Sequence, residues 1–202
     1  VGDLGIDTIT DALRPRVVSA TVLPPAGSEF LNRSDVRPGM IDYSVSEEYV
    51  SPADYTDVMR RGIPAVDDLL FTMEAPLGNV ALVDRTDIAL AQRIIKFRAD
   101  RKIVAPKFLM YSIMGGGFQS QLIERATGST ALGLKASKLH ELRVAVASVD
   151  EQVRIVGFLD ERCAKIDALI DKSTEMIETL HEYRSALITD AVTGKIDVRE
   201  VA

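Results

Sequence analysis

The stretch from Ser148 to Gly194, SVDEQVRIVGFLDERCAKIDALIDKSTEMIETLHEYRSALITDAVTG, decides the fold. Apolar residues recur along it in strict three–four alternation: Val156, Leu159, Cys163, Ile166, Ile170, Ile177, Leu180, Leu187 and Ala191. Ser173 and Arg184 interrupt the series, which runs for about five heptads and predicts the packing seam of a coiled-coil helix. The seam has no comparable helix to pack on within the chain, so it needs a partner helix.

Both ends of this helix carry sequence signals. Ser148 and Glu151 have the spacing of a capping box, in which each side chain bonds the backbone N–H of the other residue. Gly194 followed by Lys195 is a typical helix stop. We therefore expect one helix from residue 149 to about 192, roughly 66 Å long at 1.5 Å per residue.

The residues before Ser148 predict a small mixed domain. A turn over 75–79 separates two strand patterns, because Pro presets φ and Gly and Asn tolerate positive φ. The expected elements are strands at 68–73, 80–83, 92–98 and 142–146, a helix at 106–126 broken at Gly115–Gly117, and mostly loops in the first 60 residues. The predicted fold class is α+β, with a domain at residues 1–147 and a helical spacer with its tail at 148–202.

Composition limits the class of protein. The chain has 202 residues, of which 47% are hydrophobic and 27% charged, the balance of a folded chain. No apolar run is long enough for a membrane span, and the first ten residues carry no secretory signal. We expect no membrane partner and a cytoplasmic location. The chain opens with Val rather than Met, which we interpret as removal of upstream sequence.

Charge is distributed unevenly along the chain. The net charge of −6 by itself disfavours binding to nucleic acid. From Ser148 onward there are 7 Lys and Arg against 12 Asp and Glu, so most of the acidity belongs to the long helix and its tail. The preceding residues hold 17 basic and 18 acidic side chains, which leaves room for a local basic surface.

Features that could support catalysis or metal binding have simpler structural explanations. Gly115–Gly117 follows a helical pattern and lacks the Gly-Lys-Ser/Thr of a phosphate loop. Cys163 lies on the helix seam, and the two histidines have no partners at metal-ligand spacing. The acid pairs Glu47–Glu48 and Asp67–Asp68 are typical of solvated loops. We predict no catalytic residue, no metal and no cofactor on this chain.

Basic and amide side chains in the loops are candidates for DNA contacts. Arg bonds guanine bidentately, Asn bonds adenine and Lys contacts phosphate. We expect the recognition surface in the loops before Gly62 and around residues 128–138. The candidates are Asn32, Arg33, Arg37, Arg60, Arg61, Lys135 and Lys138, led by the four arginines. The same residues also fit the ordinary polar surface of a soluble domain, so this pattern alone leaves both interpretations open.

A set of motifs resembles one protein family. It comprises LFTMEAPLGNV at 70–80, AQR at 91–93, Phe118-Gln119, Gly128-Ser129-Thr130, Glu151-Gln152 and YRSALITDAVTGKID at 183–197. Together these motifs, within about Tyr43 to Asp197, are similar to the DNA specificity subunit of Type I restriction–modification systems. The chain departs from the family at Ala147-Ser148, where prolines usually precede Glu-Gln.

The resemblance implies a target recognition domain followed by a spacer helix. Full-length members carry two such units, whose helices pack antiparallel so that the subunit reads a bipartite site on double-stranded DNA. The subunit catalyses nothing itself: methyltransferase subunits hold S-adenosylmethionine and modify adenine, and translocating endonuclease subunits join that core. The present chain then corresponds to half a subunit, either a natural half-subunit or a C-terminal fragment.

Two functions follow, and one experiment separates them. Half a subunit restores the paired helices only by pairing with its own copy, which predicts an antiparallel homodimer that reads a palindromic bipartite site. The alternative is a coiled-coil scaffold whose globular part binds protein without direct DNA contact. A steep dependence of DNA binding on salt would favour the first, since it reports phosphate contacts.

Overall fold

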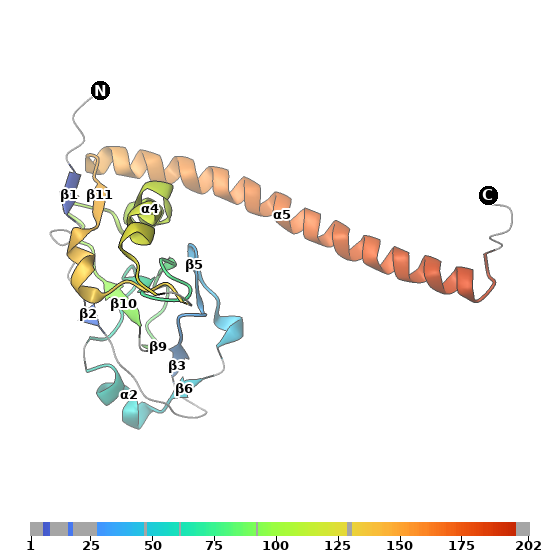
Figure 1. The fold of residues 1–202 in the computed structure, drawn as a ribbon, viewed down its shortest axis with the longest axis horizontal. Coiled ribbons are helices and arrows are strands. Elements are labelled where there is room, and N and C mark those ends of the chain that lie inside the picture. Colours follow the sequence, from blue (N-terminus) through green and yellow to red (C-terminus); the bar gives the residue numbers. More distant parts are fainter. Residues whose placement is uncertain are drawn as a thin grey trace. The chain divides into compact units, whose positions relative to one another are not determined.

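The computed structural model describes residues 6–8, 16–17, 28–46, 48–60, 62–91, 93–128 and 131–196. The chain divides into two compact units, Val1–Val156 and Gly157–Ala202, which we describe separately. The first unit holds the small sheets and short helices, and the second holds most of one long helix (Figure 1). This is the predicted α+β class. Among the described residues, no helix combines the length and apolar character needed to cross a membrane.

The larger sheet of the first unit contains three of the predicted strands. Its order is β2 (Arg16–Val17), β10 (Ile94–Phe97), β7 (Leu69–Thr72) and β8 (Val80–Leu82), and every pairing is antiparallel. All residues of β7 and β10 are buried, as their near-continuous apolar runs require. The β7–β8 connection is the predicted turn at 75–79.

Two helices and a strand pair complete this core. Helices α3 (Pro106–Met114) and α4 (Gly116–Arg125) are separated at Gly115, whose extended backbone confirms the predicted break. Phe71 of the sheet packs against Phe97 and Phe118, with ring centroids 5.8 and 6.4 Å apart. Strand β11 (Arg143–Ala145), the fourth predicted strand, pairs with β1 (Ile6–Thr8) and follows the 3-10 helix η2 (Ala136–Glu141).

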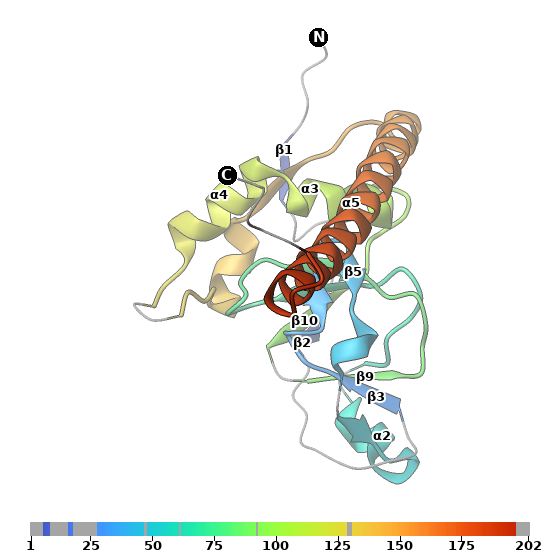
Figure 2. The ribbon, with the colours of Figure 1, turned by 90° about the vertical axis from the view of Figure 1, so that its right-hand side faces the viewer.

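A second core surrounds a three-stranded sheet that the sequence did not predict. Its order is β6 (Tyr49–Val50), β3 (Ser28–Leu31) and β9 (Ile88–Leu90), with β3 and β9 parallel. Helix α2 (Pro52–Val58) packs beside these strands (Figure 2). A hairpin of β4 (Val36–Arg37) and β5 (Met40–Ile41) and the 3-10 helix η1 (Tyr43–Val45) lie between them in sequence. The expectation of mostly loops here was therefore wrong for residues 28–58.

Helix α5 (Val149–Val192) has the predicted bounds and is tied to the first unit at its start. The fully buried Gln152 side chain accepts from Ala105 N–H at 2.8 Å and donates to the carbonyls of Ile103 and Ala147 at 2.9 and 2.8 Å. The backbone N–H groups of residues 151 and 152 donate to the Ser148 carbonyl. The first turns of α5 therefore belong to the globular unit, and the predicted division after residue 147 stays a prediction.

Candidate nucleic-acid interface

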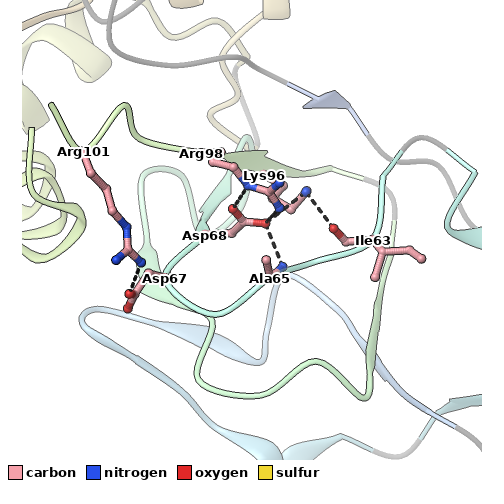
Figure 3. A network of polar contacts seen from close by, with 7 residues as sticks. All are labelled: Ile63, Ala65, Asp67, Asp68, Lys96, Arg98 and Arg101. Atoms are coloured by element: carbon pink, nitrogen blue, oxygen red, sulfur yellow. Dashed lines mark hydrogen bonds and ion pairs between the residues drawn. The ribbon is translucent and has the colours of Figure 1, made fainter. Parts of the chain in front are cut away.

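Asp68 anchors the segment that leads from α2 into the larger sheet (Figure 3). Its carboxylate accepts from Lys96 Nζ at 3.0 Å, from Arg98 at 2.6 and 2.8 Å, and from Ala65 N–H at 2.9 Å. Burial alone would raise the pKa of Asp68, but these hydrogen bonds outweigh it, with Arg98 first, and hold the pKa below its usual value. Asp68 is 1% exposed, so its predicted place in a solvated acid pair was wrong.

The loop that carries Arg33 is closed by a local turn. The buried Asp35 carboxylate accepts from Asn32 N–H at 2.8 Å, and Asp35 N–H donates to the Asn32 carbonyl at 3.0 Å. Aspartate favours such turns because its short side chain bonds nearby backbone groups. The turn follows β3 directly and fixes the backbone of Arg33 at the carboxyl end of that strand.

Glu74 gathers two arginines beside this turn. Arg33 Nη1 lies 3.2 Å from Glu74 Oε1, and Arg93 pairs with the same oxygen. Arg33 and Arg93 remain 43% and 53% exposed at their side chains. Because β3 and β9 are parallel, the residues that follow them emerge at one edge of the sheet, and this brings the two arginines together.

Backbone hydrogen bonds join this arginine edge to the second predicted loop region. Met73 N–H donates to the Arg93 carbonyl at 3.0 Å, and Leu134 N–H donates to the Met73 carbonyl at 2.8 Å. Glu74 also forms an isolated antiparallel bridge with Gly133. The structure therefore brings Arg33, from the loops before Gly62, close to Gly133 and Leu134 of the second predicted loop region, and the recognition surface itself stays a prediction.

The opposite edge of the same sheet is acidic. Arg85 pairs with Glu29 and with Asp87, the latter at 3.3 Å, and its guanidinium lies 4.0 Å from the Tyr43 ring centroid. Tyr43 donates its hydroxyl hydrogen to Asp84, and burial followed by this hydrogen bond raises the pKa of Tyr43. Two carboxylates pair with Arg85 here, and a third, Asp84, binds Tyr43. The edge with Arg33 and Arg93 presents two exposed arginines beside the partly exposed Glu74, so it suits a polyanion better.

The other predicted contact residues are dispersed around the first unit. Arg37 lies 3.8 Å from Asp42, and Asn32 donates to Glu48 at 3.1 Å. Arg60 is exposed after α2 and shows no ion pair within the described ranges, while Arg61 lies outside the described residues. Lys135 and Lys138 are exposed in and before η2. Lys138 Nζ donates a hydrogen bond to Glu141 at 2.6 Å, and this bond is the main cause that lowers the pKa of the Glu141 carboxyl.

Sequence reasoning missed Arg93 as a site residue. It used AQR at 91–93 only as a family marker, yet Arg93 follows β9 and faces Arg33 across Glu74. Arg93 has φ of 74°, a region that costs an L-residue about 1–2 kcal/mol and favours Gly. A basic residue directly between two apolar strand patterns was the available signal.

Residues of the motif at 70–80 fix the turn and the hairpin next to this arginine edge. Thr72 Oγ donates to the Pro76 carbonyl and accepts from Asn79 N–H at 3.0 Å, which closes the turn. Asn79 Nδ2 then donates to the Val36 carbonyl at 2.8 Å and holds the hairpin that follows the Arg33 loop. Gly78 has φ of +86° and packs against Gln119, whose Nε2 donates to the Gly78 carbonyl at 3.1 Å. Thr72, Gly78 and Asn79 of the motif are therefore structural supports, while Glu74 of the same motif stays partly exposed.

Comparison with known proteins now decides the family. Residues 60–179 match the sequence model of the Type I restriction modification DNA specificity domain, which is more than half of the chain. The chain belongs to this family. The resemblance inferred from the motifs is thereby confirmed.

The relatives of this Type I specificity chain are distant in sequence. The Escherichia coli Type I restriction enzyme EcoBI specificity subunit is 19% identical over 171 residues, which cover 84% of the chain and 36% of that protein. A crystal structure of the S subunit from M. genitalium has a TM-score of 0.57 at 18% identity, covering 83% of this chain and 41% of that one. The crystal structure of the HsdS subunit from Thermoanaerobacter tengcongensis has a TM-score of 0.61 at 15% sequence identity. The match covers 96% of this chain and 47% of that one. The chain thus spans between about a third and a half of these relatives.

Proposed function

We propose that this Type I specificity chain recognises a specific sequence of double-stranded DNA through its first unit. Family membership supports the function, and the edge formed by Arg33, Arg93 and Glu74 supports the surface. Guanidinium groups bind both phosphates and base edges, while the acidic edge around Arg85 would repel the DNA backbone. The observation that carries the proposal is the match of residues 60–179 to the specificity domain.

The long helix would serve as spacer and dimer interface. Its seam in the second unit is open to solvent, with Ile166, Ile170 and Ile177 each more than half exposed. An antiparallel pair of two copies would cover both seams and place two recognition units in two-fold symmetry. Such a dimer would read two inverted half-sites separated by a fixed spacer.

Catalysis would come from partner proteins. We assign no catalytic residue, metal or cofactor to this chain, and we place S-adenosylmethionine on a methyltransferase subunit. That subunit and the translocating endonuclease subunit would be directed to the bipartite site by the specificity chain. Purified chain should therefore transfer no labelled methyl group to DNA, whereas adding the methyltransferase subunit should produce transfer.

A salt titration tests DNA binding against the scaffold alternative. Fluorescence anisotropy of a labelled mixed-sequence duplex should rise with added protein, and the logarithm of the association constant should fall linearly with the logarithm of salt concentration. A slope near zero, or no binding at low salt, would favour a protein-binding scaffold. The near-neutral charge of residues 1–147 makes this slope informative, because only a local basic surface produces it.

A further inference from the structure

We propose that Arg33, Glu74 and Arg93 act as one base-reading group that contacts a G·C pair of the DNA target. The proposal rests on the proposed DNA-binding function and names the residues that would supply its specificity. Both arginines share one oxygen of Glu74. The other oxygen, Oε2, has no hydrogen-bond partner among the residues that the structure describes.

The chemistry of this group matches a base pair better than a phosphate. Arginine donates two parallel hydrogen bonds to guanine O6 and N7, and a carboxylate accepts from the cytosine N4 amino group. One G·C pair presents these acceptors and this donor side by side in the major groove. A phosphate presents only acceptors and negative charge, so a carboxylate at the same point would weaken a pure phosphate site.

The protein holds the group in place before DNA arrives. Arg33 stands in the turn closed by Asp35, and the Arg93 carbonyl is bonded to Met73 N–H, next to Glu74. Glu74 restricts both guanidinium groups, so less side-chain freedom is lost on binding. Specific contacts need this preorganisation, because a mobile arginine contacts phosphates and bases alike.

A second group with the same charges shows what a purely structural role looks like. Asp68 also binds two cations, but its carboxylate and Lys96 are 1% and 3% exposed, and of the three groups only Arg98, at 57%, reaches solvent. Glu74 is 29% exposed, and both of its arginines are open to solvent. Moreover, Arg93 keeps a positive φ that Gly would adopt without cost. An exposed arginine at a strained backbone position points to a role in binding.

Substitution of Arg93 separates function from stability. Arg93→Gly removes the guanidinium and relieves the backbone, so its unfolding temperature should equal or exceed that of the wild type. The probe is the duplex that wild-type protein enriches most from a randomised pool. Binding to that duplex should weaken about 5- to 100-fold, and Arg33→Ala should have a similar effect. Unchanged binding by both variants would overturn the proposal.

Glu74→Gln tests the positioning role. This change removes one negative charge and loosens both arginines, so binding to a scrambled duplex should strengthen while the ratio of enriched to scrambled affinity falls. A residue that only supports the fold would lower both affinities together, and that result would refute its positioning role. Arg101→Ala is the control, because Arg101 is an exposed arginine paired with Asp67 at 2.5 Å in the same unit. The ratio of enriched to scrambled affinity of Arg101→Ala should equal that of the wild type.

Base analogues test the contact directly. Replacing each guanine of the enriched duplex in turn by 7-deazaguanine removes the N7 acceptor. At one guanine position the replacement should weaken binding of the wild type but not of Arg93→Gly or of Arg33→Ala. This is expected when the base change and the arginine change remove the same contact. Equal losses in wild type and variants at every position would contradict a guanine contact. If the wild type enriches no duplex, the proposed DNA-binding function fails first.

Discussion

Aspartate at both Ile166 and Ile170 should dissociate the proposed homodimer. These side chains are 55% and 56% exposed in the single chain, and their burial against a second copy provides part of the association free energy. Complete burial of such a side chain is worth about 1.5–3 kcal/mol, so covering the exposed half contributes ~1 kcal/mol. Two residues on each of two chains then contribute ~4 kcal/mol, roughly a thousandfold in the dissociation constant.

Sedimentation equilibrium of the full chain measures this effect. The wild type should have twice the chain mass of 22.1 kDa at micromolar concentration, and the double variant should have the single mass. Ala164→Asp with Ala168→Asp is the matched control, because it adds the same charge at the same spacing on the opposite face of the helix. A wild-type mass near 22.1 kDa would refute the homodimer. If the wild type is a dimer and the Ile166/Ile170 double variant is still a dimer, the assigned seam is refuted.

Three further predictions concern the first unit. Gln152→Ala removes three part-buried hydrogen bonds to backbone groups and should cost about 3 kcal/mol of unfolding free energy, whereas Gln121→Ala, whose bonds are exposed, should cost under ~1 kcal/mol in the same denaturant titration. Gly78→Ala should lower the unfolding temperature, because a Cβ there would lie 2.7 Å from Leu122 Cδ1, while Gly116→Ala in open space should leave it unchanged or raise it. The lowered pKa of Asp68 stabilises the fold above the unfolded-state pKa of about 4, and this stability is lost as pH falls through the folded pKa. Asp68→Asn should therefore flatten the acid limb of a stability–pH curve; an unchanged limb would contradict the assignment.

Local sequence patterns predicted the elements whose signals are themselves local. The seam from Val156 to Ala191 and the stop at Gly194 give the bounds of α5, because helix periodicity and capping depend on neighbouring residues. Strands β7 and β8 followed from the strand patterns on either side of the turn at 75–79, and β10 from Ile94, Ile95 and Phe97 among charged residues. Gly115 marked the break between α3 and α4.

The second sheet could not be predicted in the same way. Strand β9 has three residues and pairs in parallel with β3, which lies far away in sequence, so neither strand carries a pairing signal of its own. The arginine edge depends on that pairing. Arg33 could be proposed from its residue type. Its shared ion pair with Arg93 and Glu74 depends on the parallel pairing of β3 and β9 and on the positive φ of Arg93, which an arginine in the sequence does not indicate.

Selection from a randomised pool of DNA duplexes tests the central claim most directly. The purified full chain is incubated with the pool at moderate salt, and bound duplexes are recovered, amplified and sequenced over several rounds. We expect enrichment of two inverted half-sites at a constant separation, each with an invariant G·C pair. Recovery of the input pool without any enriched sequence would contradict sequence-specific recognition by this chain.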